Sequence, residues 1–161
     1  MVKYFLIVLL IIALLILLII IRNQKRKRAL FLMQKESQKI TNKAFSYAIH
    51  HVNLLELKKS DTQFNSEFVS SVWGSKVTAF EFSLEVPGIQ TEDLPQIKAE
   101  VQFNLQKYAE KHQLKAYKEH LVFYVSDIWI FSNVLHIDVS HIINEETWAY
   151  VEDVQKSDKT K

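Results

Sequence analysis

The sequence predicts an α+β protein with an N-terminal transmembrane helix, a long amphipathic helix and a small antiparallel sheet of three or four strands packed with helices. Three observations lead to this fold class. Residues 4–21 form one uncharged apolar run, residues 76–86 alternate with a period of two, and residues 93–112 repeat with a helical period. Helices beside a small antiparallel sheet accommodate both periods in one domain of about 125 residues.

The apolar run at residues 4–21 predicts a single-pass membrane anchor. It contains no charge, glycine or proline, and 16 of its 18 residues are Leu, Ile, Val or Phe. An 18-residue helix is about 27 Å long, close to the thickness of the hydrocarbon core of a bilayer. A cleaved signal peptide fits less well, because Lys3 is the only charge before the run and no A-x-A-like site follows it. We therefore expect a retained signal-anchor.

A basic juxtamembrane segment, residues 22–28, follows the run and sets the expected topology. Positive charges beside a span stay on the cytoplasmic side. This rule predicts a cell-membrane protein with residues 1–3 outside, residues 4–21 in the membrane and residues 22–161 in the cytoplasm. The same charges can bind anionic lipid headgroups, or they can serve topology alone. The five charged residues are Arg22, Lys25, Arg26, Lys27 and Arg28.

The charge and composition of the body exclude several classes of function. Residues 29–154 contain 11 lysines and no arginine against 17 acidic residues, a net charge of −6. Nucleic-acid binding is not expected, because a phosphate backbone requires clustered basic residues. Two glycines are too few for a phosphate-binding loop or a dinucleotide fingerprint. The chain has no cysteine and no G-x-S-x-G motif, so we expect neither an enzyme nor a bound cofactor.

Residues 29–60 predict a long amphipathic helix that leaves the membrane. Its apolar positions alternate in steps of three and four, interrupted by the polar residues Ser37 and His51. One interpretation is a coiled-coil seam that forms a homodimer. The other, which the polar positions favour, is a helix that packs on its own domain. The seam residues are Leu30, Met33, Ile40, Ala44, Tyr47 and Leu54.

Residues 61–154 predict the α+β domain, beginning with a short helix. Asp61 can cap a helix that runs through Trp73 and stops at Gly74, although the FVSSVW stretch is also compatible with a strand. The alternation at residues 76–86 then predicts a strand with one apolar face. Pro87-Gly88 ends that strand.

The second half of the domain predicts a helix, a hairpin and a final helix. The helix over residues 93–112 begins at Asp93, which forms a capping-box-like pair with Gln96. Two β-rich runs, residues 121–131 and 134–141, are separated by Ser132-Asn133, which predicts a tight hairpin with a bulge near Ser126-Asp127. Asn144 caps the final helix. Residues 155–161 are polar and predict a disordered tail.

Two groups of side chains are candidates for a site. His136 and Asp138 lie on the same face of one predicted strand, which supplies half of a metal site, but no third ligand has a defined spacing, so no metal is predicted. Trp129 and Phe131 form a partner patch if they point away from the helices. The alternative places both aromatic side chains in a second core layer under a helix.

These observations favour a membrane-anchored protein whose cytoplasmic α+β domain acts as a protein-interaction scaffold or accessory subunit of a membrane assembly. The expected partners are membrane lipids, through the anchor and the basic segment, and other proteins or a second copy. A tethered domain that binds a small molecule or lipid is one alternative. A tethered extracytoplasmic component of a secretion or envelope machine is another, and it requires the charge rule to fail.

Overall fold

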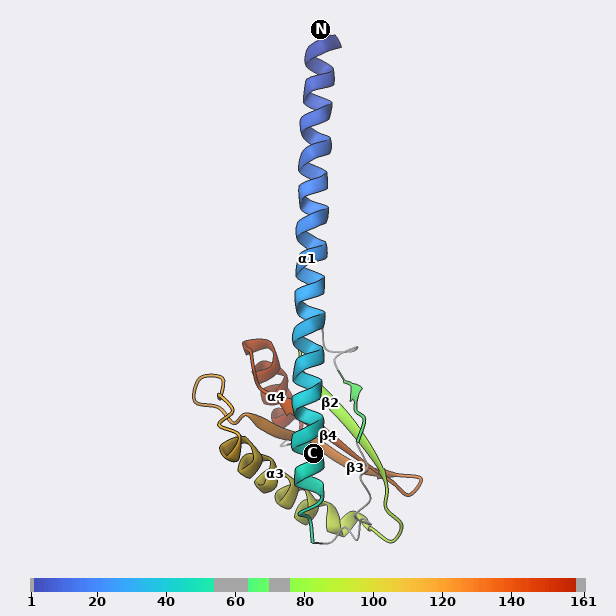
Figure 1. Ribbon diagram of the computed structural model, residues 1–161. Helices are drawn as coiled ribbons and strands as arrows, with labels where there is room; N and C mark the ends of the chain where they lie inside the picture. The colour runs from blue at the N-terminus through green and yellow to red at the C-terminus, as the bar shows by residue number, and fades with distance from the viewer. Residues whose placement is uncertain (1, 54–63, 70–75, 159–161) are drawn as a thin grey trace. The chain divides into compact units, whose positions relative to one another are not determined.

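The computed structural model describes residues 2–53, 64–69 and 76–158, except for the side chains of residues 2, 3 and 5–8. The chain divides into two compact units, Met1–Lys35 and Glu36–Lys161. A single helix, α1 (Val2–Ile49), forms the first unit and the start of the second (Figure 1). Helix α1 ends at Ile49, whereas the sequence predicts that the amphipathic helix continues to residue 60. Residues 54–60 lie outside the described part of the chain.

The first unit is the N-terminal part of α1. Its side chains from Leu9 to Ile21 are exposed around the whole helix, as are the five basic residues of the juxtamembrane segment. Among the described residues, no helix is both long and apolar enough to cross a membrane, so the transmembrane part of the predicted fold class has no structural support.

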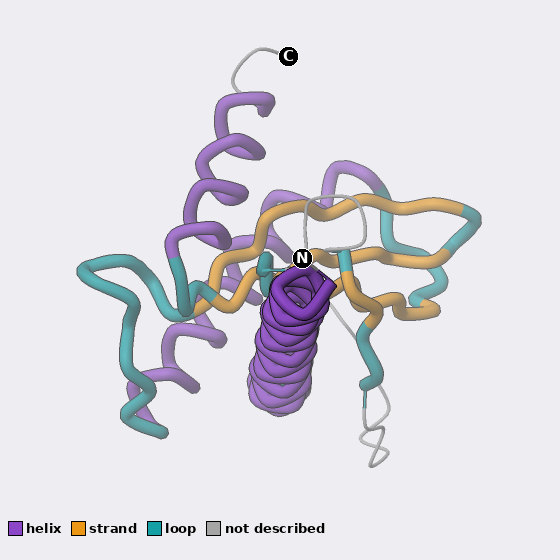
Figure 2. Tube along the Cα trace, turned by 90° about the horizontal axis from the view of Figure 1, so that it is seen from above, coloured by secondary structure: helices purple, strands orange, loops and turns teal. Residues whose placement is uncertain are grey.

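The second unit is an α+β domain with a four-stranded antiparallel sheet, as predicted. The strand order is β1-β2-β4-β3 (Figures 1 and 2). Strand β4 lies inside the sheet because it pairs with β3 through a hairpin and with β2 on its other side. The strands are β1 (Glu67–Phe68), β2 (Ala79–Glu85), β3 (Phe123–Phe131) and β4 (Val134–His141).

One face of the sheet carries the main hydrophobic core. The C-terminal part of α1 and the whole of α3 (Leu94–Lys111) pack on this face, which confirms the apolar stripe predicted for residues 93–112. Phe45 of α1 stacks on Phe82 of β2 with ring centroids 3.8 Å apart and an interplanar angle of 10°. Both rings are fully buried, so this contact ties α1 to the sheet.

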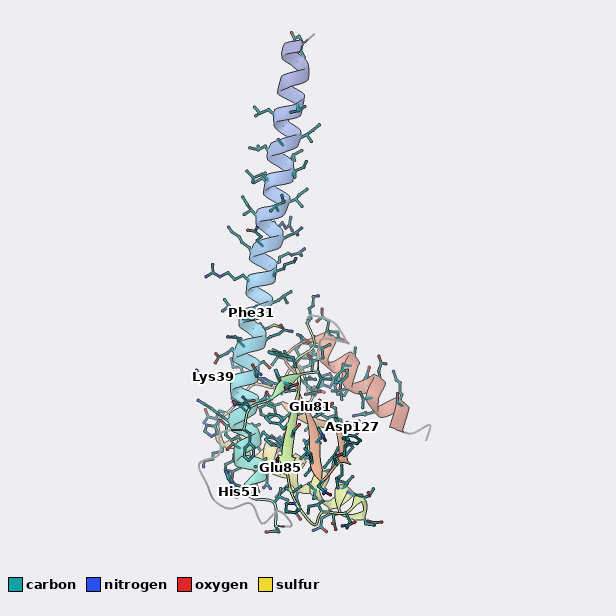
Figure 3. The ribbon with its side chains drawn as sticks, turned by 90° about the vertical axis from the view of Figure 1, so that its right-hand side faces the viewer. Phe31, Lys39, His51, Glu81, Glu85 and Asp127 are labelled. Atoms are coloured by element: carbon teal, nitrogen blue, oxygen red, sulfur yellow. The ribbon has the colours of Figure 1, made fainter. Side chains whose placement is uncertain are left out.

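Among the described residues, α4 (Glu145–Asp158) packs on one part of the opposite face of the sheet (Figure 3). Tyr150 and Val151 of this helix pack with Val77, Ala79 and Ile142 in a second, smaller apolar cluster. Residues 155–158, which were predicted to belong to a disordered tail, form the last turn of α4.

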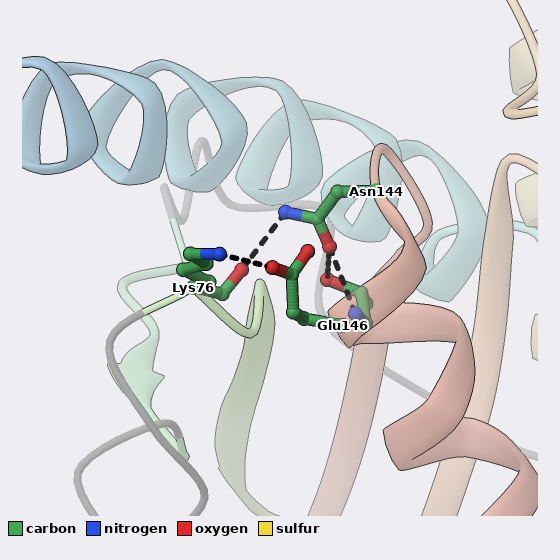
Figure 4. A network of polar contacts seen from close by, with 4 residues as sticks. Lys76, Asn144 and Glu146 are labelled. Atoms are coloured by element: carbon green, nitrogen blue, oxygen red, sulfur yellow. Dashed lines mark hydrogen bonds and ion pairs between the residues drawn. The ribbon is translucent and has the colours of Figure 1, made fainter.

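A cap at the start of α4 holds the helix at this end of the sheet (Figure 4). The Asn144 side-chain oxygen accepts hydrogen bonds from the Thr147 backbone N–H at 2.8 Å and the Thr147 hydroxyl at 2.7 Å. Its amide nitrogen donates to the Lys76 carbonyl at 2.9 Å, and the Lys76 ammonium group pairs with Glu146. The predicted Asn144 cap is confirmed, and it links α4 to the residues just before β2.

Side chains occupy much of the free edge of β3. The Gln102 amide of α3 donates to the Phe123 carbonyl at 3.0 Å and accepts from the Val125 N–H at 2.9 Å. Further along, the Asp127 carboxylate accepts from the Ile128 N–H at 2.8 Å. These backbone groups would otherwise face outward from the edge strand.

Two local predictions are wrong. The short helix proposed around residue 67 is a strand there, because Glu67 and Phe68 pair with Glu81 and Phe80 of β2, and the Phe68 ring lies 5.3 Å from the Phe80 ring. Sheet pairing and packing override the weak helical period. The proposed helix ends, Asp61 and Trp73-Gly74, lie outside the described residues.

The predicted capping box at Asp93 is the second error. A 3₁₀ turn, η1 (Thr91–Asp93), precedes α3, and the Asp93 carboxylate accepts a hydrogen bond from the Gln90 N–H at 2.9 Å. That carboxylate therefore stabilises the 3₁₀ turn, and its side chain makes no capping hydrogen bond to α3.

The hairpin between β3 and β4 confirms the predicted turn and gives a first test of the fold. Ser132 and Asn133 both have positive φ angles, 50° and 63°, as a type I′ turn requires. The double variant S132N/N133G should raise the free energy of unfolding by about 0.5–1 kcal/mol, because Asn and Gly adopt this conformation with less strain. Urea denaturation measures the effect. Ser132→Val is the opposite control and should destabilise by about 1–2 kcal/mol.

Candidate functional site

The half of the outer sheet face that α4 leaves uncovered gathers the chemically distinctive side chains of the domain. Antiparallel register places residues from neighbouring strands side by side in rows. We call this surface the open half of the sheet. Its three rows are Glu67–Glu81–Asp138–Asp127, Ser83–His136–Trp129 and Glu85–Val134–Phe131.

The first of these rows, which we call the acidic row, crosses all four strands. Glu67, Glu81, Asp138 and Asp127 are successive neighbours in it. Like charges directly opposite one another on paired strands destabilise a sheet. A row of four acidic residues therefore concentrates negative charge on this face at a cost in stability. Figure 3 labels two of them, Glu81 and Asp127.

A β-bulge puts Asp127 into the acidic row. Val125 pairs with Val139 on the core face, but the next pair is Asp127 with Asp138, so Ser126 is an extra residue. The Ser126 hydroxyl lies 2.7 Å from the Ser140 hydroxyl of β4. The extra residue shifts the alternation, so that Asp127 faces outward while the isoleucines that follow it pack toward the core. The predicted bulge at Ser126-Asp127 is confirmed.

Asp138 is the most perturbed group of the acidic row. Its side chain belongs to a residue that is only 7% exposed, and within the described structure its Oδ1 atom has no hydrogen-bond partner. Burial, followed by the charges of Glu81 and Asp127, raises the pKa of Asp138 to about 7. Asp138 therefore exchanges its proton near neutral pH, which is unusual for a carboxyl group.

Tyr150 of α4 borders the acidic row from above the sheet. Burial, and then the charge of Asp138, raises the pKa of Tyr150 to about 12, and a hydrogen bond with Ser126 partly opposes this shift. Tyr150 thus stays protonated at neutral pH and forms the boundary between the covered and open halves of the face.

The second row combines an imidazole with an aromatic ring. The His136 Nδ1 atom lies 2.8 Å from the Glu81 carboxylate and 3.2 Å from the Ser83 hydroxyl. The Trp129 indole stacks on the His136 ring, with centroids 5.0 Å apart and an interplanar angle of 4°. This arrangement fixes the imidazole between a carboxylate and an aromatic face.

The predicted partner patch lies on the open half of the sheet. Trp129 is half-buried against His136, and Phe131 is 71% exposed. The structure thus separates the two residues: Trp129 packs within the row, and Phe131 projects into solvent at the hairpin end. Beside Phe131, a hollow of about 240 Å³ is lined by Glu85, Pro87, Ser132, Asn133 and Val134.

The residues of the predicted self-association seam fall in different environments. Ala44 is fully buried in the domain core, and Ile40 packs against that core. The Tyr47 ring lies 5.6 Å from the Tyr108 ring of α3. These three positions of the second unit contact their own domain. Leu30 and Met33 belong to the first unit, and Leu54 lies outside the described residues.

The candidate metal half-site gains acidic neighbours without becoming a metal centre. His136 and Asp138 lie on one face of β4, beside Glu81 and Asp127. Over residues 2–53, 64–69 and 76–158, however, no group of three or more His, Cys, Asp or Glu side chains has the geometry to hold a metal ion. The site is suited instead to binding a cationic or hydrogen-bond-donating group.

Sequence reasoning found the aromatic pair but missed the acidic row. The alternation of β2 does place Glu81 on the outer face, and this was the one sequence feature that pointed toward the acidic row. The register that aligns it with Asp138 and Asp127 depends on strand pairs distant in sequence.

No protein-family model matches this chain, and no curated protein or solved structure shows significant similarity to it.

Proposed function

We propose that this is a single-pass membrane protein whose cytoplasmic α+β domain docks another protein through the open half of the sheet, as a scaffold or accessory subunit of a membrane assembly. The observation that carries the proposal is the exposed Phe131 beside Trp129, on a sheet face that α4 leaves uncovered. Exposed aromatic residues of this kind are typical of protein interfaces.

The anchor in this proposal is supported by the sequence of the first unit. Residues 4–21 carry no charge, and the backbone of this run is helical throughout. The described side chains from Leu9 to Ile21 are apolar and exposed. Exposed apolar side chains on all sides of a helix suit a lipid environment. The adjacent basic segment supports the cytoplasmic placement of the domain.

The hollow at the hairpin of the open half is smaller than a typical small-molecule site. The hollow beside Phe131 has a volume of about 240 Å³. Typical small-molecule sites occupy about 300–1,000 Å³ and enclose most of the ligand. A flat sheet face with a projecting aromatic ring is better suited to a protein surface.

Affinity capture of the full chain from its native membrane tests the proposal. Phe131→Ala should reduce the recovery of specifically bound proteins by about tenfold, as expected for an exposed aromatic anchor. Phe103→Ala is the matched control, because Phe103 is 59% exposed on α3, away from the open half. The bait itself should resist carbonate extraction from the membrane. Equal recovery with both variants would contradict docking at this face.

A further inference from the structure

The open half of the sheet presents carboxylates with few cations to balance them. In the described residues, Lys76 and Lys118 pair with Glu146 and Glu145, outside the open half. Lys98 of α3 donates to the Ser126 carbonyl beside Asp127 at 3.4 Å, so this ammonium group lies near one end of the acidic row. The ion pair seen within the open half joins His136 to Glu81, and residues 29–154 contain no arginine. The face therefore has an excess of negative charge that a basic partner can complement.

Asp138 places a buried carboxyl group, closed to direct contact with a partner, within the field of the acidic row. Its residue is 93% buried by area, it faces the acidic row between Glu81 and Asp127, and its Oδ1 atom has no hydrogen-bond partner in the described structure. Buried polar atoms are nearly always paired, and each exception calls for a physical explanation. A cation held by Glu81 and Asp127 would stabilise the charged form of this carboxyl group.

We propose that the open half of the sheet binds an extended, arginine-bearing segment of another protein. This inference rests on the proposed docking function and names the chemistry of the partner. A guanidinium group pairs with the carboxylates of Glu81 and Asp127, while a second contact stacks on Phe131. Arginine suits this surface better than lysine because its planar group binds carboxylates in a bidentate manner and also stacks on aromatic faces.

The spacing of the rows matches an extended segment. Residues two apart on a strand are about 6.8 Å apart, and side chains two apart on an extended peptide have the same spacing. A segment that lies along the strand direction can therefore place one basic side chain at the acidic row. Its next side chain on the same side reaches the His136 row, and the following one reaches Phe131.

Binding of a guanidinium group should release a proton from Asp138. Glu81 faces Asp138 from β2, Asp127 from β3 and Tyr150 from α4, and His136 precedes it on the same face of β4. Neutralising the charges of Glu81 and Asp127 removes two of the causes that favour the protonated form of Asp138. At pH 7, binding should release up to about half a proton per complex.

The experiment uses the full chain in detergent micelles and a fluorescein-labelled peptide in which three arginines alternate with serines. The matched probe replaces each arginine with citrulline, which keeps the shape and removes the charge. Fluorescence anisotropy should show about tenfold weaker binding of the citrulline peptide. The variant E81Q/D127N should weaken binding of the arginine peptide by about tenfold, whereas the charge-matched control E92Q/E119Q should stay within about twofold.

Calorimetry in two buffers of different ionisation enthalpy supplies a second readout. Proton release at pH 7 should disappear in Asp138→Asn, and the urea denaturation of every variant shows that it is folded. Equal binding of the arginine and citrulline peptides, or unchanged binding to E81Q/D127N, would overturn the inference. Self-association of the chain that competes with the peptide and is lost in R26Q/R28Q would also overturn the inference. That result would mean that the open half binds the basic segment of a second copy.

Failure of this inference is distinguishable from failure of the docking function. If captured proteins depend on Phe131 but bind E81Q/D127N normally, docking stands and the arginine-bearing partner is excluded. If neither set of variants affects capture, both proposals fail.

Discussion

Asp138→Asn is expected to stabilise the α+β domain by about 4 kcal/mol at pH 8 and by less than about 1 kcal/mol at pH 4. The pKa of Asp138 is raised from 3.8 to about 7 in the folded chain. Between these two values the folded state holds a proton that the unfolded state has lost. The stability contributed by the protonated carboxyl is thus present at low pH and is lost as pH rises to about 7. Asparagine keeps the shape without the ionisation.

His141 also titrates, with an effect on stability opposite to that of Asp138. The pH profile of Asp138→Asn is therefore a sharper test than its stability at one pH. Burial lowers the pKa of His141 to about 4, and a hydrogen bond with the Ser37 backbone opposes this shift. The Ser37 hydroxyl lies 2.9 Å from the imidazole Nδ1. Between pH 6.5 and 4 the unfolded state binds a proton that the folded state excludes, so stability falls on acidification. In the natural chain, Asp138 opposes this trend over the same range.

Urea denaturation from pH 4 to pH 8 measures both effects. The natural chain should have a shallow profile below pH 6.5, because the contributions of Asp138 and His141 have opposite signs. Asp138→Asn should lose about 3 kcal/mol between pH 6.5 and pH 4, because His141 then acts without opposition. Parallel profiles for the two proteins would show that Asp138 does not titrate near neutral pH.

Phe45→Ala is expected to destabilise the domain by about 3–5 kcal/mol, the range for removal of a fully buried aromatic ring. Phe45 stacks on Phe82 and meets Phe64 edge-on, with ring centroids 5.6 Å apart and an interplanar angle of 87°. Its loss leaves a cavity between α1 and the sheet. The midpoint of urea denaturation at pH 6.5 should fall, with an unchanged dependence on urea concentration.

Phe103→Ala is the control for this variant, since Phe103 is 59% exposed on α3. Its effect should stay within about 0.5 kcal/mol, as for most surface substitutions. A loss below 1 kcal/mol for Phe45→Ala would mean that α1 does not depend on this ring for its attachment to the domain core.

The parts of the fold that depend on local chemistry could be predicted from the sequence. Alternation assigned Phe80, Phe82 and Leu84 to one face of β2, and the polar pair Ser132-Asn133 located the hairpin. Inward and outward positions follow from the two-residue period of a strand, and a short turn sets the pairing of its two flanking strands.

The acidic row depends on pairing that local patterns do not encode. Glu81 and Asp138 are neighbours through the pairing of β2 with β4, which are separated by α3 and β3 in the chain. Local patterns favoured a helix over the strand that was also possible from Phe68 onward, because β1 has two residues and forms only against an existing neighbour. The burial of Asp138 likewise arises from tertiary packing that no spacing within β4 could reveal.

The side chains along the edge of β3 have a consequence for the protein at high local density. Gln102 and Asp127 occupy backbone groups that an incoming strand would need for pairing. Asp127 and Glu67 also put negative charge on both edge strands of the sheet. If the proposed anchor confines copies of the chain to two dimensions, they collide far more often than copies in solution, and open sheet edges would then seed aggregation. The occupied edge of β3 and the charge on both edge strands would then oppose polymerisation through the sheet.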